Sequence, residues 1–273
     1  MPEQTVAKTQ QSTPSSQYPT PAALTIAGSD SSGGAGIQVD LRSFQRQQVY
    51  GCTAITAVTA QNGVGVQALE ILPAALVREQ LVSILQGIPV AAAKTGMLGH
   101  AAIIQAVAEC WRDCDIPLVV DPVMVATSGA SLLPAAAIDS LRQHLLPLAT
   151  LVTPNLPELA ALTALPVEQP HQRLAAATRL LELGCDAVLI KDGHGGGAQV
   201  NDVLFDGDRQ WRFTHPRLTG EYHGTGCASS AAICAALARG LTLADAVEYA
   251  LDDLHQRLQS ARPSLCGAVH YIW

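Results

Sequence analysis

Short apolar runs alternate with longer amphipathic segments along most of the chain. Six runs are apolar at consecutive positions, as in strands covered on both faces: 23–28, 53–61, 90–96, 117–123, 150–155 and 187–193. Helical periodicity fills most of the segments between them and continues afterwards, at 36–48, 74–87, 100–114, 135–146, 172–183, 227–239 and 243–260. A strand followed by a helix, repeated in this way, predicts an α/β fold with a mostly parallel sheet between layers of helices.

Two turn dipeptides interrupt this alternation. Asn62-Gly63 and Asp206-Gly207 each lie between short apolar stretches, and both dipeptides favour tight hairpin turns. The sequence therefore predicts antiparallel ribbons attached to the parallel sheet.

The beginning of the chain has a different composition. Residues 1–21 are rich in Gln, Ser, Thr and Pro and offer almost nothing to bury, which predicts a disordered tail. No repeat, linker or change of composition divides residues 22–273, which we expect to form one domain.

Composition and charge narrow the class of protein. Hydrophobic residues make up 48% of the chain but aromatic ones only 4%, so Ala, Leu, Val and Ile must build the core. The net charge of −7 argues against nucleic acid and anionic membranes as partners, because both favour basic surfaces. The seven cysteines are scattered and follow no secretory leader pattern, which favours a reducing cytoplasm.

Polar and glycine-rich residues follow each predicted strand. Ligands bind at the carboxyl ends of the strands in an open parallel sheet, so these residues are the first candidates for a site. They are the loop 28–36, Gln61-Asn62, the segment 94–97, Asp121-Pro122, and the segments 153–158 and 191–197. One glycine-rich loop says little, but six in the same position relative to the sheet indicate a site at this edge.

The stretch "HGTGCASSAAICAAL" passes from glycine-rich residues into an alanine-rich helix. A glycine-lined helix start points backbone N–H groups and the positive end of the helix dipole at an anion, which predicts a phosphate site at 224–227. The same field would lower the pKa of the Cys227 thiol. Alternatively, Cys227 is a small buried residue, as most free cysteines are. A Cys–His hydrolase would need a base, and His223, although close in the chain, has no orienting pattern of its own.

Two carboxylates and a lysine suit the other end of a phosphate site. Asp121 and Glu158 could hold Mg²⁺, which prefers a few carboxylates together with waters and substrate phosphates. Glu158 also lies in the first turn of a Pro-bounded helix start, where a carboxylate is favoured in any case. Lys191, at a strand end beside a glycine-rich loop, suits a phosphate contact, although a lone lysine is more often solvated. The chain has neither a P-loop nor a standard dinucleotide fingerprint.

Six stretches together resemble one known family. They are "ALTIAGSDSSGGAGIQVDLRSF", "YGCTAITAVTAQN", "KTGML", "VVDPVM", "TPNLPE" and "HGTGC". With these motifs in this order, the chain from about Ala22 onward resembles the hydroxymethylpyrimidine/phosphomethylpyrimidine kinases of thiamin biosynthesis. The resemblance implies a ribokinase-like three-layer α/β/α sandwich with a mostly parallel central sheet. It also implies ATP and Mg²⁺ as cofactors, and phosphorylation of 4-amino-5-hydroxymethyl-2-methylpyrimidine and then of its monophosphate.

The resemblance also implies a role for each matching residue. The positions that line the aminopyrimidine pocket are Asp40, Gln61, Met97 and Val123. The Mg²⁺–nucleotide region is represented by Asp121, Asn155 and Glu158, with Lys191 near the ATP phosphates. The anion hole and its reactive cysteine correspond to Gly224, Thr225, Gly226 and Cys227, with Cys227 as the base or as part of the hole only.

Some residues depart from the family pattern, and two other functions stay open. Thr127 stands where the family has a lysine, and Asp192 puts a carboxylate beside the nucleotide region, which predicts weaker phosphate binding, above all in the second phosphorylation. The alternatives are a pyridoxal kinase, because the folds and the cysteine-containing hole overlap, and a non-catalytic aminopyrimidine-binding protein. A homodimer is common in relatives and is expected here.

Overall fold

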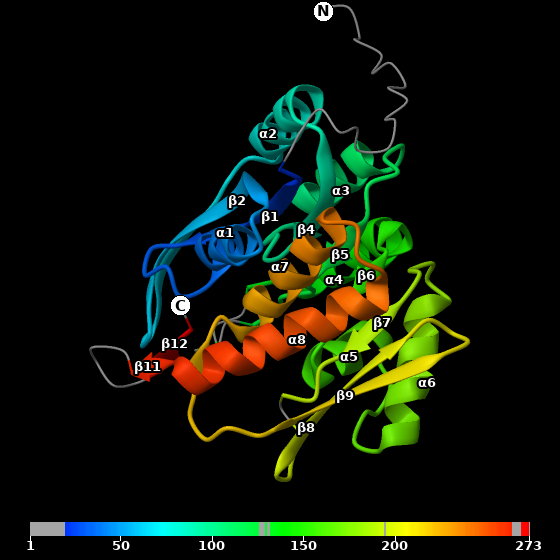
Figure 1. Cartoon of the computed structure of the whole chain (residues 1–273). Helices are drawn as coiled ribbons and strands as arrows, with labels where there is room; N and C mark the ends of the chain where they lie inside the picture. The colour runs from blue at the N-terminus through cyan, green and yellow to red at the C-terminus, as the bar shows by residue number, and fades with distance from the viewer. Residues whose placement is uncertain (1–19, 126–128, 130–131, 194, 264–268, 273) are drawn as a thin grey trace, which may run out of the picture.

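A nine-stranded sheet forms the centre of the computed structural model, which describes residues 20–125, 129, 132–193, 195–263 and 269–272 (Figure 1). The strand order is β3-β2-β1-β4-β5-β6-β7-β8-β9. All neighbours from β2 to β7 run parallel, whereas β3 at one edge and β8 and β9 at the other pair antiparallel. The strands are β1 (Ala22–Asp30), β2 (Tyr50–Asn62), β3 (Gly65–Ile71), β4 (Val90–Thr95), β5 (Leu118–Val120), β6 (Leu151–Val152), β7 (Val188–Ile190), β8 (Gln199–Phe205) and β9 (Gln210–Pro216).

Eight α-helices in the described ranges cover the two faces of this sheet (Figure 1). One face is covered by α2 (Ala74–Gly87), α3 (Ala101–Trp111), α4 (Ala135–Ser140), α5 (Leu156–Thr163) and α6 (Pro170–Leu181), and the other by α1 (Gly36–Arg46), α7 (Thr225–Ala238) and α8 (Leu243–Ser260). The predicted three-layer α/β/α arrangement is therefore confirmed.

Successive strand residues serve the two faces in turn. In β5, Leu118 and Val120 pack in the core under α2 to α6, whereas Val119 between them packs in the core under α1, α7 and α8. Each of the three is at most 1% exposed. Because both faces are covered, the strands read as continuous apolar runs rather than as alternating ones.

The helix α7 lies in the middle of its layer. Its buried residues are almost all Ala or Ser, and both α1 and α8 pack against it. Small side chains let α7 approach its neighbours closely. Because it is surrounded by α1, α8 and the sheet, its apolar residues are not confined to one side of the helix. This packing brings the N-terminus of α7 to the carboxyl ends of the central strands.

The elements differ from the sequence-based prediction in three places. The segment 135–146 is not one α-helix, because α4 ends at Ser140 and a π-helical turn (Leu141–Leu145) and a 3-10 turn (Leu146–Leu148) follow. The helix α5 was recognised only by its first turn. A second, three-stranded sheet in the order β10-β12-β11 was missed: β10 (Tyr222–His223), β12 (His270–Tyr271) and β11 (Arg262–Pro263). Two-residue strands are too short to show any periodicity.

Both predicted hairpins are confirmed. Asn62 ends β2 and its side chain accepts hydrogen bonds from the backbone of Val64 and Gly65, which closes the turn into β3. Asp206 does the same between β8 and β9, where its Oδ1 accepts from the N–H groups of Asp208 and Arg209.

Candidate active site

The ends of β5, β6 and β7 bring three of the predicted site residues together. Asp121 follows β5, and Asn155 and Lys191 follow β6 and β7. The N–H of Lys191 donates to Pro154 O (2.9 Å), and Asn155 and Lys191 form a parallel bridge that extends the sheet by one step. The nucleotide-side residues predicted from the sequence therefore lie at one edge, as expected for the carboxyl ends of the strands in an open parallel sheet.

Asp121 and Lys191 form an ion pair. The Lys191 Nζ atom lies 3.0 Å from Asp121 Oδ1, and the hydroxyls of Thr153 (3.3 Å) and Ser230 (3.1 Å) donate to the same carboxylate. Burial alone would raise the pKa of Asp121, but the charge of Lys191 and these hydrogen bonds outweigh burial and lower it. Lys191 is thus not a solvated lysine: it is held at a fixed position with only 14% of its side chain exposed.

Asn155 and Glu158 begin the helix α5 with a reciprocal cap. Asn155 Oδ1 accepts from the N–H of Glu158, and Glu158 Oε2 accepts from the N–H of Asn155, both at 2.9 Å. Burial is the main cause that raises the pKa of Glu158, to about 7, and the charge of Asp121 adds to it, against the opposing effect of Lys191. The structural interpretation of "TPNLPE" as a helix start is confirmed, and it leaves the Glu158 carboxyl beside the Asp121–Lys191 pair.

The N-terminus of α7 lies against this pair. Gly224 is the N-cap residue, and its φ of 78° is in the left-handed region that favours glycine. A Cβ on Gly224 would lie 2.0 Å from Gly34 O, so the 28–36 loop leaves no space for a side chain. A Cβ on Gly226 would lie 3.4 Å from Lys191 Nζ and 3.6 Å from Asp121 Oδ2. The helix start, with Thr225 as its first residue, therefore meets a fixed positive charge.

Cys227 lies in the first turn of α7, but its thiol is not acidic. Burial and, to a smaller extent, the charges of Asp40 and Asp121 raise the pKa of Cys227 to about 11, against the opposing effect of Lys94. The prediction that the helix start would lower this pKa is therefore wrong for the free protein. The loss of solvation is the main cause of the raised pKa, and the carboxylates of Asp40 and Asp121 add to it.

Beneath Cys227 lies an ion pair that the sequence did not reveal. Lys94 Nζ lies 3.0 and 2.9 Å from the two carboxylate oxygens of Asp40, the Thr25 hydroxyl donates to the same carboxylate at 2.6 Å, and neither charged side chain is exposed at all. Burial would lower the pKa of Lys94, but Asp40, Cys227 and Asp121 together raise it. Asp40 is therefore held inside the protein rather than presented to solvent as a pocket residue. A lysine directly after three alanines in "VAAAKTG" was the available signal, because a buried lysine needs a partner.

Gln61 contacts a different group of residues. Its Nε2 atom lies 3.3 Å from His223 Nε2, which in turn lies 3.1 Å from Asp30 Oδ2. Asp30 also accepts hydrogen bonds from the backbone of Ser32 and Ala35 and so fixes the 28–36 loop. His223 is thus engaged with Asp30 and Gln61, so this geometry does not supply the base that a Cys–His hydrolase would need.

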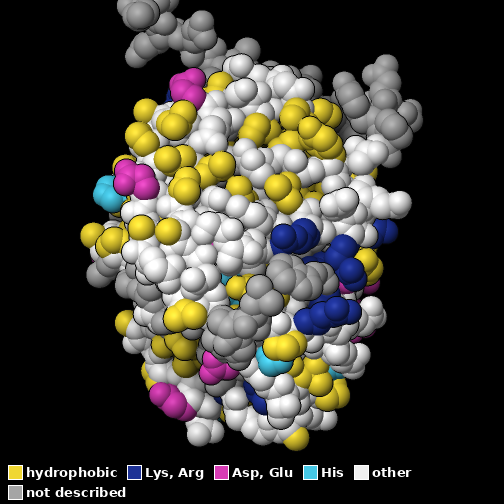
Figure 2. Space-filling view, turned by 90° about the vertical axis from the view of Figure 1, so that its left-hand side faces the viewer, with side chains coloured by type: hydrophobic (Ala, Val, Ile, Leu, Met, Phe, Trp, Pro, Cys, Tyr) yellow, Lys and Arg dark blue, Asp and Glu magenta, His cyan; other side chains and the backbone are white. Residues whose placement is uncertain are grey.

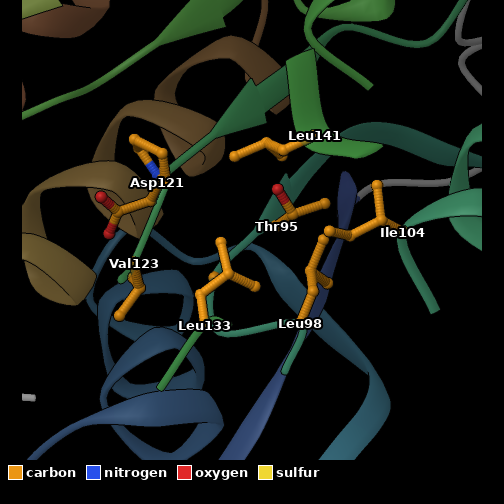
Figure 3. A pocket seen from close by; sticks show the side chains of 9 residues that line it. Thr95, Leu98, Ile104, Asp121, Val123, Leu133 and Leu141 are labelled. Carbon is orange, nitrogen blue, oxygen red and sulfur yellow. The ribbon is translucent and has the colours of Figure 1, made fainter. Parts of the chain in front are cut away.

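Met97, after β4, and Val123, after β5, form an apolar wall near Asp121. They pack in a small cluster with Ala57, Leu132 and Ile71, and Ile71 also packs against the core under α2 to α6. Next to this wall is a pocket of about 10 Å³, room for roughly one water molecule, between the ends of β4 and β5 (Figure 3). Figure 3 shows Asp121 on one side of this pocket and Leu98 and Ile104 on the other. The buried Thr95 Oγ1 there has no partner, so the pocket suits a water rather than a pyrimidine.

Asp192 does not face the proposed phosphate region as a free charge. It is 5% exposed, and its carboxylate is paired with Arg173 at 3.0 Å and accepts from the N–H of Asn201. The Arg217 guanidinium fixes the 192–199 loop by donating hydrogen bonds to four of its carbonyls, those of Asp192, Gly193, Gly197 and Gln199. This neutralised position removes the reason to expect that Asp192 repels phosphate. Thr127 and His194 lie outside the described residues.

Comparisons with known proteins agree with this geometry. Residues 30–270 match the family model described as phosphomethylpyrimidine kinase. The chain is 45% identical over 241 residues to a hydroxymethylpyrimidine/phosphomethylpyrimidine kinase of Rhizobium meliloti, covering 88% of this chain and 91% of that one.

Two solved structures are similar over most of the chain. An ADP complex of Bacillus subtilis pyridoxal kinase matches with a TM-score of 0.85 and 35% identity, covering 93% of this chain and 97% of that one. A phosphomethylpyrimidine kinase from Clostridium difficile 630 matches with a TM-score of 0.77 and 36% identity, covering 87% of this chain and 99% of that one.

A three-layer fold of this kind, with a glycine-lined helix start facing a lysine–carboxylate pair, defines a ribokinase-like small-molecule kinase. Within that class, the chain belongs to the phosphomethylpyrimidine kinase family. The family, the fold and the kinase class predicted from the sequence are confirmed. None of the helices in the described part of the chain has the length and apolar character that a bilayer crossing requires.

Proposed function

We propose that this kinase transfers the γ-phosphoryl group of ATP to 4-amino-5-hydroxymethyl-2-methylpyrimidine, and then phosphorylates the monophosphate, in thiamin biosynthesis or salvage. The observation that carries the proposal is the meeting of the α7 N-terminus with the Asp121–Lys191 pair. Phosphoryl transfer needs little covalent help from the protein, so positioned N–H groups and a fixed cation are its main requirements.

The nucleotide side of the site is assigned to residues that the fold already holds in place. Lys191 would contact the ATP phosphates, because its ammonium lies beside Gly226 and is oriented by Asp121. The N–H groups of Gly224 to Cys227 would bind the transferred phosphoryl group as its charge spreads over its oxygens. Asn155, at the N-cap of α5, would contact the nucleotide from the adjacent strand end.

The carboxylates fit a Mg²⁺ ion that is held mainly by phosphates. No group of three His, Cys, Asp or Glu side chains that could hold a metal exists in the described ranges. Mg²⁺ commonly takes one or two carboxylates, with substrate phosphates and waters as its other ligands. Asp121 and Glu158 would hold it, and when bound it would neutralise negative charge between the phosphates.

The pyrimidine would lie over the apolar wall. Met97 and Val123 would contact the face of the ring, and Gln61 would form hydrogen bonds with its polar edge. The hydroxymethyl group would face Cys227. Asp40 can act on the substrate directly only if its buried carboxylate is uncovered, and otherwise it acts through Lys94 beneath the site.

Cys227 is proposed as the group that accepts the hydroxyl proton, or as part of the anion hole only. A thiol with a pKa of about 11 is protonated at neutral pH, so the base role requires bound phosphate or substrate to change its surroundings. The pH–rate profiles of wild type and Cys227→Asp separate the two roles. If Cys227 is the base, the carboxylate variant should stay active to lower pH than wild type. Unchanged profiles would leave Cys227 as part of the hole.

Pyridoxal is the second candidate substrate, since a pyridoxal kinase is among the similar structures. Purified protein with ATP, Mg²⁺ and each of three acceptors tests both: hydroxymethylpyrimidine, its monophosphate and pyridoxal. We expect the pyrimidine to give the highest kcat/KM. Preference for pyridoxal would favour the second candidate. Pyrimidine binding by calorimetry without any ADP formation would instead favour a non-catalytic binding protein.

Two further proposals concern the state of the protein. The six cysteines that the structure describes are free thiols, which suits a reducing cytoplasm. A homodimer is supported by the exposed side chains of Tyr50, Val58, Val64 and Leu69 on the β2–β3 hairpin. Figure 2 shows the face that lies on the left in Figure 1, and hydrophobic side chains are exposed at many points on it. Light scattering that gives the mass of one chain at micromolar concentration would contradict the dimer.

A further inference from the structure

His223 lies where three segments of the site meet. It follows Tyr222 in β10 and precedes the N-cap Gly224, and its Nε2 faces Asp30 Oδ2 at 3.1 Å and Gln61 Nε2 at 3.3 Å. The side chains of His223 and Asp30 are 5% and 3% exposed. A Cβ on Gly34 would lie 2.3 Å from His223 Cδ2, and the ring of Tyr271 packs edge-on at 6.0 Å between centroids. The imidazole is therefore held in one orientation.

The protons around His223 Nε2 decide which group donates. Burial alone would raise the pKa of Asp30, but hydrogen bonds from His223 and Ser32 outweigh it and lower the pKa, so Asp30 is a carboxylate. A carboxylate only accepts hydrogen bonds, so Nε2 of His223 must carry a proton and donate it to Asp30. A protonated ring nitrogen has no lone pair left to accept a hydrogen bond from the Gln61 amide N–H.

A second conflict exists on the other side of the same amide. The Thr59 hydroxyl faces both Ser29 O at 3.0 Å and Gln61 Oε1 at 3.3 Å, and it has one hydrogen to donate. A rotation of the Gln61 amide by 180° removes the donor–donor clash at His223 and the competition at Thr59. Gln61 Oε1 then shares the His223 Nε2–H with Asp30 Oδ2 in a three-centre hydrogen bond. Gln61 Nε2–H donates to Thr59, whose hydroxyl donates to Ser29 O.

We infer that His223, held by Asp30, is a positioning residue that fixes the amide orientation of Gln61 and thereby selects the hydrogen-bonding edge of the substrate ring. This inference rests on the proposed function. With one N–H given to Thr59 and one lone pair to His223, the amide keeps one N–H and one oxygen lone pair for a ligand. That pair matches a ring with an acceptor nitrogen beside an exocyclic amino group. A ring with an oxo group beside a ring N–H presents the opposite order.

The orientation also decides whether binding is productive. With the amide reversed, the ring would bind turned over, so that its amino group and ring nitrogen exchange places. The hydroxymethyl group would then point away from 224–227. Because His223 and Gly224 are neighbours in the chain, the same segment sets the edge of the ring and the position of the anion hole. A site that must satisfy a buried donor and acceptor rejects a mismatched ligand strongly.

The protonation state of His223 is the first test, and it does not depend on activity. In protein labelled with ¹⁵N-histidine, long-range ¹H–¹⁵N correlation spectra distinguish protonated from bare ring nitrogens, and His223→Phe assigns the signal. If that variant does not fold, selective disappearance of the signal in His223→Gln assigns it instead. We expect protonated Nε2 at neutral pH. A bare Nε2, with the proton on Nδ1 alone, would overturn the inference.

Substrate preference is the second test. We expect wild type to prefer the 4-amino pyrimidine over its 4-oxo analogue, and His223→Phe to reduce that ratio of kcat/KM by at least about tenfold, mainly through KM. Thr59→Val should reduce the ratio by less and His223→Gln, which keeps an N–H donor, should restore part of it. An unchanged ratio in folded His223→Phe would contradict the inference. Wild type that phosphorylates neither ring would refute the proposed function instead, and the NMR test would still decide the role of His223.

Discussion

Lys94 and Asp40 form an ion pair in which neither side chain has any exposed surface, and the ammonium contacts both carboxylate oxygens. The pair lies under the start of α7, where both charges act on Cys227. Its geometry links the end of β4 to α1 and so connects the substrate side of the site to the anion hole.

Removing one partner of this pair should be far more harmful than removing both. Lys94→Met leaves the Asp40 carboxylate buried without a counter-charge, and we expect a loss of roughly 3–5 kcal/mol in the free energy of unfolding. The double variant Lys94→Met/Asp40→Asn should recover most of it. Urea unfolding measures both, with Arg179→Met as the control, because the exposed Arg179–Glu182 pair should contribute under about 1 kcal/mol. Equal losses for Lys94→Met and Arg179→Met would contradict this account.

Alanine substitutions at Gly224 and Gly226 should have different effects, the first on stability and the second on activity. Gly224→Ala forces a side chain into a left-handed backbone and against Gly34 O, so it should lower stability by roughly 2 kcal/mol or more. Gly226→Ala meets no close contact, but its methyl group would occupy the space beside Lys191. It should keep the melting temperature and lower kcat on the order of 10²-fold. Thermal unfolding and initial rates separate the two, and full activity in Gly226→Ala would show that phosphate does not bind there.

Arg217 should control nucleotide binding through the 192–199 loop. Its guanidinium donates to four backbone carbonyls of that loop, so Arg217→Gln should loosen the loop and raise KM for ATP by about tenfold, or roughly 1.4 kcal/mol. The KM for the pyrimidine should change little. Arg212→Gln is the matched control, because Arg212 is exposed on β9, the strand that ends just before Arg217. A similar KM for ATP in both variants would exclude the loop from the nucleotide site.

Asp202 should make stability depend on pH. Burial is the main cause that raises its pKa to about 6 from an ordinary value near 3.8, although it accepts from the N–H of Asp192. The folded state therefore holds the proton more tightly, so this contribution is complete below the ordinary pKa and is lost as the pH rises through 6. One pKa unit corresponds to 1.36 kcal/mol, so the shift from 3.8 to about 6 amounts to about 3 kcal/mol in total.

Asp202→Asn keeps an acceptor for Asp192 but does not titrate. Its free energy of unfolding relative to wild type should thus rise by roughly 2 kcal/mol between pH 4 and pH 7, most of the total. Urea unfolding of both proteins at the two pH values checks this. A constant difference would show that Asp202 titrates normally.

The sequence alone was sufficient for the layers and for the residues at the strand ends. Buried parallel strands and amphipathic helices each have a periodicity that a single sequence displays, and α2 was predicted with its observed bounds. The strand ends then follow, because a parallel sheet collects them at one edge.

What the sequence could not give was pairing between distant side chains. Lys94 and Asp40 are 54 positions apart, and His223 and Asp30 are 193 apart. The elevated pKa of Cys227 is caused first by burial and then by the charges of Asp40 and Asp121, so a local argument from the helix start gave the wrong sign. The harmless position of Asp192 likewise depends on Arg173 and Arg217, which no local pattern connects to it.

The most direct test of the central claim is ³¹P NMR of ATP, Mg²⁺ and hydroxymethylpyrimidine with wild type and with Lys191→Met. The account predicts that wild type forms ADP together with a pyrimidine monophosphate signal, and that Lys191→Met, folded as judged by circular dichroism, forms it at least about 10²-fold more slowly. Equal rates in the two proteins, or folded wild type that leaves ATP and pyrimidine unchanged, would contradict it.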